Sequence, residues 1–394
     1  MKRFFINSVF AFMFCSLNAT ITLPTLISDN MVLQQGKLVT IWGWTSVSDE
    51  TIKVSGSWNS IDTSTVQAVA GKWKVQIFTP TQGGPYTLCI KGHETKIINN
   101  VMIGEVWMAC GQSNMAFVIS MLKNSSLGND YYNDILTMAN YPKIRMFNVQ
   151  KIASNTPQDN CPGTAWQLTT PTTVDKFSAV CYYFAKSIHD SLSVPVGIIN
   201  SSWGGSNAES WVHGDSVTLN QKLYDSYKKL IGNGWDTLPP GQNYNGMIYP
   251  TENYSIKGAL YYQGESNKEN SNTYTELLSK LISSWRISRK EDFPFYMVQI
   301  TPYTQAGVTS MNIRDAQRRL LSIPKTGLVV TSDFSDITLL HPPQKDEVGR
   351  RLSLWSLAND YGKKLSFSGP QYKSMKISGD KISVKFDYAD GLNT

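Results

Sequence analysis

The feature that most limits the possible folds is an alternation of apolar, strand-like runs with helical patterns after residue 100. The runs are nearly continuous in apolar residues, which is typical of strands that are buried on both faces. They are VMIGEVWMAC (101–110), KIRMFNVQ (143–150), VPVGIIN (194–200), IKGALYYQ (256–263), FYMVQIT (295–301) and GLVVTSD (327–333). Helical patterns occupy residues 177–192, 273–285, 311–321 and 345–361. This alternation predicts a parallel sheet with helices on both faces, whose ligands bind beyond the carboxyl ends of the strands.

Residues 20–100 follow a different pattern, with short strand-like segments separated by turns of Gly, Ser, Asp and Pro. The segments are LVTIWGW (38–44), TIKVSGSW (51–58), AVAGKWKVQI (68–77) and YTLCIKG (86–92). Short, evenly spaced strands without a helical period predict an antiparallel β-sandwich domain over residues 20–100. We expect this domain to cover one face of its neighbour, and independent sugar binding is the alternative.

The N-terminus has the pattern of a secretory signal peptide. Met1-Lys2-Arg3 precedes an apolar run of about 14 residues, and Ala19 offers a small residue for cleavage. The run is too short to span a membrane, which takes about 20 apolar residues. A lipoprotein site at Cys15 is the alternative, but the residues before it are large. We therefore expect a secreted or periplasmic protein, with residues 1–19 removed and no integral membrane segment left.

The C-terminus predicts a β-hairpin. Residues 375–386 alternate apolar and polar side chains around the turn Ser378-Gly379-Asp380-Lys381. A lone hairpin is marginally stable in water. We therefore interpret residues 366–394 as the start of a C-terminal β segment that is truncated in this chain.

Composition excludes some classes of function. Hydrophobic residues make up 41% of the 394 residues and charged residues only 17%, which indicates a globular chain. The net charge of +6 comes without a long basic run, so nucleic acid is not an expected partner. Many Trp, Tyr, Asn, Ser and Thr residues favour a neutral, hydroxylated ligand. Four cysteines beyond the signal peptide, at positions 89, 110, 161 and 181, match no zinc motif, and buried free thiols are favoured over disulfides.

Polar motifs follow three of the predicted core strands. Ser113, in GQSNM after the first strand, is a nucleophile if a base lies nearby, and a helix N-cap otherwise. The glycines of NSSWGGSN (200–207) allow backbone N–H groups to approach an oxyanion, or form an ordinary turn. YYQGESN (261–267) supplies an amide and a carboxylate, as a surface loop also would. Together these motifs predict one site at the carboxyl edge of the sheet.

His341 is the best candidate for the base. It follows the last core strand and the acidic stretch 333–336, whereas His213 is a lesser candidate. The resulting order along the chain is serine, acid, histidine, which is one of the known orders of a catalytic triad. Nucleophile, backbone donors and base in one place predict the hydrolysis of an acyl ester.

GQSNM, NSSWGGS, YNGMI (244–248), YYQGESN and the late His-Pro resemble motifs of the sialate O-acetylesterase family of SGNH-type carbohydrate esterases. The resemblance runs from about residue 22 to the end and includes LPTLISDNMVLQQ. It implies a three-layer α/β/α SGNH-hydrolase-like domain at residues 101–365, between the β-sandwich and the partial C-terminal β segment. It also implies an O-acetylated carbohydrate as substrate, and a reaction that requires no metal and no cofactor.

The resemblance assigns roles to single residues. Ser113 would be the nucleophile and His341 the general base, and later the acid for the leaving alcohol. The backbone N–H groups of Ser113 and Gly205 would hold the oxyanion, with the Gln263 amide as a third donor. Further candidates for substrate binding or support of the site are Asn114, Trp203, Arg314 and Gln317. A helix residue held in a salt bridge is an equally good interpretation of Arg314.

The third member of the triad is open. SGNH hydrolases place an acid two or three residues before the histidine, but Thr338 and Leu339 stand there in this chain. The candidates are Glu265, Asp336 and Asp333, and a plain Ser-His dyad is the remaining alternative. We favour Glu265, because related sugar acetylesterases use the glutamate of the QGE motif to orient the histidine.

Two other functions compete with a sialate O-acetylesterase. An esterase acting on acetylated xylan or xyloglucan would use the same chemistry in another groove, shaped by loops such as 219–242. A non-catalytic glycan-binding protein would use the many aromatic side chains to stack on sugars. The motifs at the strand ends favour an esterase over the binding protein, and they leave the acetylated sugar and the oligomeric state open.

Overall fold

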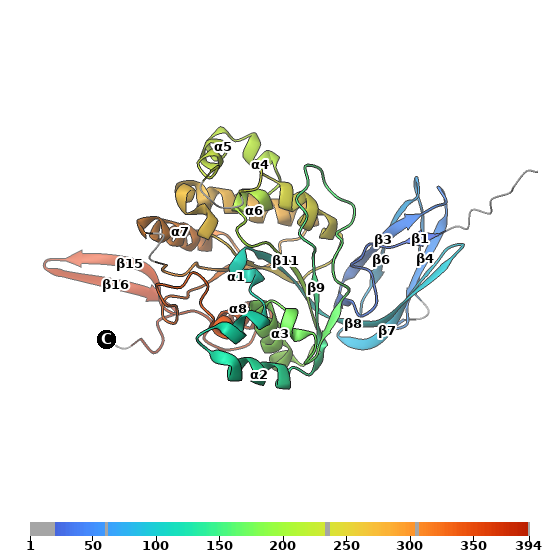
Figure 1. The fold of residues 1–394 in the computed structure, drawn as a ribbon, viewed down its shortest axis with the longest axis horizontal. Helices are drawn as coiled ribbons and strands as arrows, with labels where there is room; N and C mark the ends of the chain where they lie inside the picture. Colours follow the sequence, from blue (N-terminus) through green and yellow to red (C-terminus); the bar gives the residue numbers. More distant parts are fainter. Residues whose placement is uncertain (1–19, 60–61, 233–236, 304–306, 393–394) are drawn as a thin grey trace, which may run out of the picture.

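The computed structural model describes residues 20–59, 62–232, 237–303 and 307–392 of the chain. The predicted signal peptide at residues 1–19 lies outside this part. The described chain is a mixed α/β protein, in which a large sheet crosses the body and helices lie on both of its faces (Figure 1). Long buried strands with a helix after most of them are what the alternation after residue 100 predicts.

The central sheet has the strand order β10-β9-β11-β8-β12-β13-β14. The strands are β8 (Thr95–Gly111), β9 (Tyr141–Asn148), β10 (Gln167–Thr169), β11 (Val196–Ser202), β12 (Gly258–Tyr262), β13 (Phe295–Val298) and β14 (Thr326–Val329). Neighbours are parallel, except that β10 runs antiparallel to β9. Every residue of β11, β12 and β13 is buried, which explains their unbroken apolar character. All six predicted core strands are confirmed, and β10 is an addition.

Helices cover both faces of this sheet (Figure 1). They are α1 (Ser113–Ala116), α2 (Gly128–Met138), α3 (Ala179–Leu192), α4 (Asp215–Thr218), α5 (Gln221–Lys228), α6 (Ser271–Arg289), α7 (Gly307–Arg319) and α8 (Lys345–Asn359). The pair α3 and α8 packs on one face, and α6 and α7 pack together on the other. The four predicted helices correspond to α3, α6, α7 and α8. The helices α2, α4 and α5 were not predicted.

The N-terminal strands form two groups. They are β1 (Ile21–Thr22), β2 (Val32–Gln34), β3 (Leu38–Thr45), β4 (Thr51–Gly56), β5 (Thr63–Gln67), β6 (Lys72–Phe78) and β7 (Gly83–Lys91). Strands β1, β3 and β6 form one antiparallel sheet, whereas β5, β4 and β7 join the first half of β8. Buried side chains of both groups belong to one apolar cluster. The predicted β-sandwich is thus present as two groups of mostly antiparallel strands, and its detailed topology stays a prediction.

Strand β8 belongs to both parts of the molecule. Its first half pairs with β7 and, at residues 102–104, with β2, whereas residues 105–111 pair with β11 and 107–111 with β12. All residues from 101 to 111 are buried. The predicted domain boundary at residue 100 therefore falls inside one continuous strand, and the division into domains stays a prediction.

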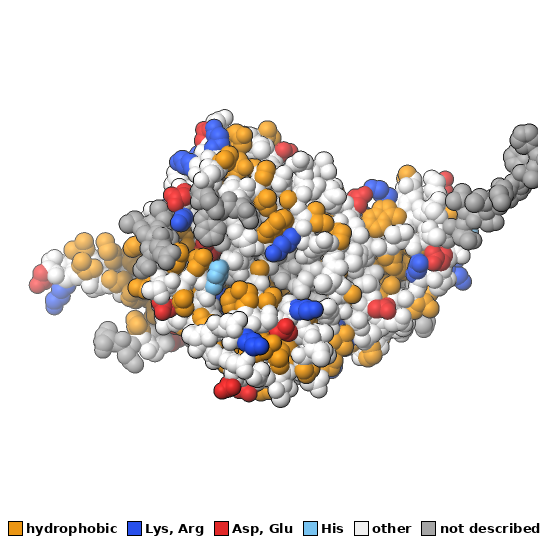
Figure 2. Space-filling view, viewed as in Figure 1, with side chains coloured by type: hydrophobic (Ala, Val, Ile, Leu, Met, Phe, Trp, Pro, Cys, Tyr) orange, Lys and Arg blue, Asp and Glu red, His pale blue; other side chains and the backbone are white. Residues whose placement is uncertain are grey.

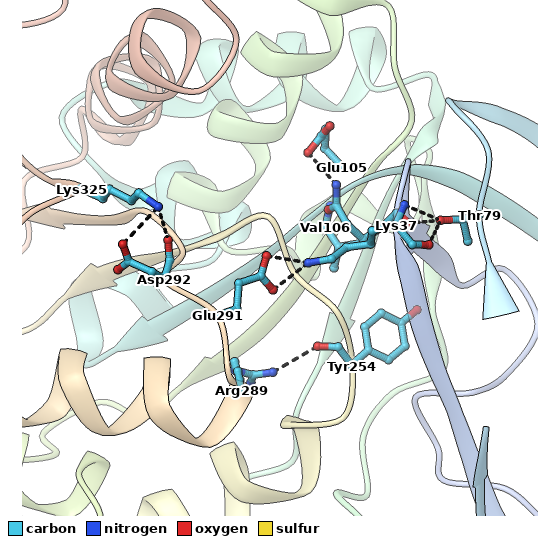
Figure 3. A network of polar contacts seen from close by, with 10 residues as sticks. Lys37, Thr79, Glu105, Val106, Tyr254, Arg289, Glu291, Asp292 and Lys325 are labelled. Atoms are coloured by element: carbon cyan, nitrogen blue, oxygen red, sulfur yellow. Dashed lines mark hydrogen bonds and ion pairs between the residues drawn. The ribbon is translucent and has the colours of Figure 1, made fainter. Parts of the chain in front are cut away.

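Side chains also join the N-terminal part of the chain to the central sheet and to the segment that follows α6. Lys37, directly before β3, forms an ion pair of 2.6 Å with Glu291 beyond the end of α6 (Figure 3). The buried Arg145 of β9 donates to the backbone oxygen of Asn30 at 2.8 Å and to the side chain of Asn100 at 3.0 Å. A half-exposed ion pair contributes at most about 1 kcal/mol, so the buried arginine is the stronger link.

The predicted hairpin near the C-terminus is confirmed as β15 (Gln371–Ser378) and β16 (Lys381–Asp387). It projects from the body as an arm (Figure 1), and hydrophobic side chains cover the visible side of this arm (Figure 2). Ile377 and Ile382, which face each other in the ladder, are 64% and 63% exposed. That the hairpin begins a longer β segment stays a prediction.

Two further expectations concern the cysteines and membrane-spanning helices. The described cysteines at positions 89, 110, 161 and 181 are free thiols, and the favoured burial holds for Cys110, Cys161 and Cys181, whereas Cys89 is only partly buried. Within the described ranges, none of the helices combines the length and the apolar character that crossing a bilayer requires.

Candidate active site

Three neighbouring strands end at one edge of the sheet. Gly111, the last residue of β8, lies in register with Ser202 of β11 and Tyr262 of β12. The next residues stay aligned, since Trp203 donates from its backbone N–H to Gly111 at 2.9 Å and Gln112 donates to Tyr262 at 3.0 Å. The three motifs predicted to meet at this edge are therefore adjacent.

Gly111 makes the turn that presents Ser113. Its φ of 142° is disfavoured for residues with a side chain, and a Cβ built there would lie 2.1 Å from the backbone oxygen of Tyr262. The chain then turns into α1, which begins at Ser113. The glycine thus lets the nucleophile candidate leave the strand directly beside the end of β12.

Ser113 and His341 lie in hydrogen-bond contact. The distance between His341 Nε2 and Ser113 Oγ is 2.7 Å, although the residues are 228 positions apart. Burial lowers the pKa of His341, and the positive charge of Lys345 lowers it further. A neutral imidazole is the form that accepts a proton, and the lowered pKa favours it, so this pair has the geometry of a nucleophile and its base.

Glu265, the favoured third member, does not contact His341. It is buried at the start of the short 3-10 segment η6 (Glu265–Asn270), and its Oε1 accepts a hydrogen bond of 2.6 Å from Asn114 Nδ2. The same Nδ2 donates to the backbone oxygen of Leu340 at 3.0 Å. Burial raises the pKa of Glu265. The amide of Asn114, expected in substrate binding, is thus fully buried between the carboxylate and the residue that precedes His341.

Asp336 and Asp333 also lie away from His341. The carboxylate of Asp336 is exposed and accepts two hydrogen bonds of 2.7 Å, from the backbone and the hydroxyl of Thr338. Asp333 pairs with Arg351 at 2.5 Å, which lowers the pKa of this carboxyl. In the part of the chain that the structure describes, no carboxylate forms an ion pair with His341, and which group completes the Ser113–His341 pair stays a prediction.

Lys345, at the first position of α8, is a residue of this site that the sequence analysis missed. Its side chain is fully buried, and Nζ lies 2.5 Å from Asn114 Oδ1. Burial lowers its pKa to about 7, against the attraction of Glu265. The signal that was present in the sequence is a lysine in the first turn of a helix, where the helix dipole disfavours a positive charge.

The glycine-rich loop after β11 lies beside the nucleophile. A Cβ built on Gly204 would meet the Cβ of Ser113 at 3.5 Å, so the two backbones are close neighbours. Gly205 has a φ of 79°, and its carbonyl accepts a hydrogen bond of 2.8 Å from the Ser266 hydroxyl. Trp203 is half-buried against the apolar core. The loop therefore lies beside Ser113 at Gly204, and the role of the adjacent Gly205 as an oxyanion donor stays a prediction.

The side-chain amide of Gln263 holds this loop in place through hydrogen bonds. Its Nε2 donates to the backbone oxygen of Ser206 at 3.2 Å and to Asn267 Oδ1 at 2.7 Å, so both amide hydrogens are engaged. Asn267 in turn donates to the buried carboxylate of Glu209. These contacts differ from the expected use of Gln263 as an oxyanion donor, because its amide points into the scaffold.

Arg314 and Gln317 hold α7 against the strand ends. Arg314 Nη2 donates to Gln299 Oε1 at 3.1 Å and also bonds the Ser332 hydroxyl. Gln317 accepts from the backbone of Ile300 at 3.0 Å and donates to the backbone of Gln263 at 2.9 Å. Both side chains therefore fix α7 to the strand ends, Arg314 through neutral partners, and their role in catalysis stays a prediction.

Metal ligands were not expected at this site. Within the described ranges, no three His, Cys, Asp or Glu side chains are grouped so that they could hold a metal ion. That the reaction requires neither metal nor cofactor stays a prediction.

Comparisons with known proteins agree with this geometry. The family described as "Carbohydrate esterase, sialic acid-specific acetylesterase" matches residues 103–354, which include the Ser113 and His341 segments. The human and mouse sialate O-acetylesterases are each 26% identical over 404 and 427 residues, covering 92% of this chain and 75% and 78% of theirs. The crystal structure of a carbohydrate acetylesterase from Xanthomonas citri has a TM-score of 0.83 and 34% identity, covering 94% of this chain and 82% of its own.

Proposed function

Because this chain belongs to the sialic acid-specific acetylesterase family of carbohydrate esterases, we propose that it releases acetate from O-acetylated sugars through an acyl-enzyme on Ser113. The observation that carries the proposal is the 2.7 Å contact between His341 Nε2 and Ser113 Oγ at the carboxyl edge of the sheet. A serine with a hydrogen-bonded base is the arrangement that nucleophilic ester cleavage requires.

In the first half of the reaction, Ser113 Oγ attacks the carbonyl carbon of the acetyl ester while its proton passes to His341 Nε2. The tetrahedral intermediate carries a negative oxygen, for which the backbone N–H groups of Ser113 and Gly205 are the proposed donors. Loss of one such donor typically costs ~10²–10³-fold in turnover. Collapse of the intermediate breaks the bond to the sugar oxygen, and His341 returns the proton to this leaving alcohol.

In the second half, water attacks the acetyl group on Ser113. His341 takes a proton from the water and returns it to Ser113 Oγ as the acyl bond breaks, so acetate leaves and the free serine is restored. The lowered pKa of His341 favours the neutral imidazole that each half of the reaction starts from. Glu265 is a positioning residue in this scheme, because it acts on the Ser113 turn through Asn114.

The chemical test measures acetate release by the purified chain from O-acetylated sialic acids and from acetylated xylan oligomers. We expect turnover of the sialic acid esters, and a preference for the xylan oligomers would assign the enzyme to plant-wall substrates instead. Ser113→Ala should remove turnover on every substrate. If this variant kept the activity of the parent protein, the acyl-enzyme mechanism would be wrong.

The same variant separates an esterase from a glycan-binding protein. For a binding protein, the parent and the Ser113→Ala variant would retain sugars equally well, and neither would release acetate. We also propose that residues 1–19 direct export, which N-terminal sequencing of protein exported by a bacterial host tests. The expected first residue is Thr20.

A further inference from the structure

A buried lysine lies beside the proposed reaction pair and has no role in the mechanism above. Lys345 is fully buried, four positions after His341, and its ammonium group also lies 5.1 Å from the ring centre of Phe117 and 5.4 Å from that of Tyr262. Burying an ammonium group is unfavourable unless it is paired and hydrogen-bonded. The buried ammonium group of Lys345 therefore needs a nearby group that compensates its positive charge.

The partner is Glu265, and the amide of Asn114 lies between the two charges. Asn114 Oδ1 accepts from Lys345 Nζ at 2.5 Å, and Asn114 Nδ2 donates to Glu265 Oε1 at 2.6 Å. An amide that accepts from a cation and donates to an anion makes two charge-assisted hydrogen bonds, which are the stronger kind. We call these three side chains the Lys345–Asn114–Glu265 bridge.

This bridge touches the chain neighbours of both reacting residues. Asn114 follows Ser113 directly, and its Nδ2 also donates to the backbone oxygen of Leu340, the residue before His341, at 3.0 Å. Lys345 itself begins the helix that the His341 segment leads into. One buried amide thus ties the nucleophile turn, the η6 segment and the histidine segment together.

We infer that Lys345 is a positioning residue of this esterase, which holds Ser113 against His341 through Asn114 and, with Glu265, sets the charge that His341 experiences. The inference rests on the proposed function, since it concerns the same Ser113–His341 pair. It assigns opposite electrostatic effects to the two ends of the bridge. The lysine opposes protonation of the imidazole, and the glutamate favours it.

The two arginines of α8 are paired with carboxylates of their own. Arg350 and Arg351 bond the carboxylate of Glu347, and Arg351 also pairs with Asp333. Burial and Asp346, the next residue after Lys345, raise the pKa of the Tyr131 and Tyr183 hydroxyls, and among the described residues the Asp346 Oδ1 is buried without a hydrogen-bond partner. Lys345 is thus the charged group that acts on His341, and Glu265 in turn acts on Lys345.

The test compares the pH dependence of kcat/KM for a chromogenic acetate ester in Lys345→Met, Glu265→Gln and the double variant. The acidic limb of this profile reports the titration of His341 in the free enzyme. We expect Lys345→Met to move this limb to higher pH, and Glu265→Gln to move it to lower pH, each by about one unit. The double variant should return the limb close to its original position. Misplacement of Ser113 should lower kcat of each single variant by about 10- to 100-fold.

A purely structural role for Lys345 would lower activity or thermal stability without moving the limb, and that result would overturn the inference. Shifts of both single variants in the same direction would overturn it as well. If Lys345→Met does not fold, the comparison of Glu265→Gln with the double variant measures the same shift, because the double variant buries no unpaired charge. Activity that survives Ser113→Ala would instead contradict the proposed function, so the two failures are distinguishable.

Discussion

Folded proteins usually bury apolar side chains and expose polar ones. The strand-end site departs from this by burying polar side chains, and the β15–β16 hairpin by exposing apolar ones. At the site, polar side chains such as Gln112, Asn114 and Gln263 are completely buried. On the hairpin, large apolar side chains such as Met375 and Ile377 are more than half exposed. The same chain therefore hides polar groups in one place and exposes apolar groups in another.

The difference lies in how the groups are connected. Each buried polar side chain at the site bonds at least one other segment of the chain, as Asn114 bonds the Glu265 and Leu340 segments. The hairpin strands bond only each other in the described sheets, and their apolar side chains face outward. A substitution at the site should therefore affect several segments at once, whereas one on the hairpin should remain local.

The largest effect on stability is expected for Asn114→Leu. Leucine has a similar size but cannot bond, so Lys345 and Glu265 would both lose their bridging partner while still buried. Leaving buried charges without partners costs about 3–5 kcal/mol, which urea denaturation at pH 7 would measure as a loss in the free energy of unfolding. Esterase activity should fall with it. A loss below about 1 kcal/mol would show that the site is no more connected than the hairpin.

An effect of comparable size, spread over pH 7 to pH 10, is expected in the pH dependence of stability. In the folded protein the pKa of Lys345 is lowered to about 7, whereas in the unfolded chain it returns to its ordinary value near 10.5. Between these two values the unfolded chain binds one more proton than the folded protein, so the stability contributed by this group rises with pH. The free energy of unfolding of the parent minus that of Lys345→Met should therefore increase from pH 7 to pH 10. A flat difference would contradict a buried lysine that titrates in this range.

The smallest effect is expected on the hairpin. Ile382→Thr keeps the β-branched shape at a position that is 63% exposed, so the free energy of unfolding should change by less than about 0.5 kcal/mol. Acetate release should be unchanged, because the hairpin supplies no residue to the site. A loss of more than about 1 kcal/mol in solution would reveal that this face of the hairpin is covered, and the contrast between the two regions would then disappear.

The sequence predicted those elements whose apolar pattern is strong. The central strands other than β10 are nearly continuous apolar runs, and the helices α3, α6, α7 and α8 have a clear period of apolar residues. Helix α2 has mostly polar residues, and Ile135 is its only buried side chain. Strand β5, with the sequence TSTVQ, buries none. Neither element carries a pattern that separates it from a loop, so neither was predicted.

The site was predicted in part for the same reason. Ser113 and the Gly205 loop follow strands whose order and direction could be inferred, which placed them at one edge. The partners of Asn114 are 151 and 231 residues away in the chain, and their choice depends on side-chain directions that no local pattern encodes. The bridge through Lys345 therefore appeared only in the structure.

Strand β8 limits how the N-terminal strands of this protein could be exchanged for those of another protein. Its residues 95–111 serve the N-terminal strands with one half and the Ser113 turn with the other. Insertion of one residue within it would turn every later side chain to the opposite face of the sheet and shift Ser113 relative to β11 and β12. A chimaera with different N-terminal strands would have to keep this strand whole. The strand that pairs with the N-terminal strands and the strand that positions Ser113 are thus the same, so one cannot be exchanged without the other.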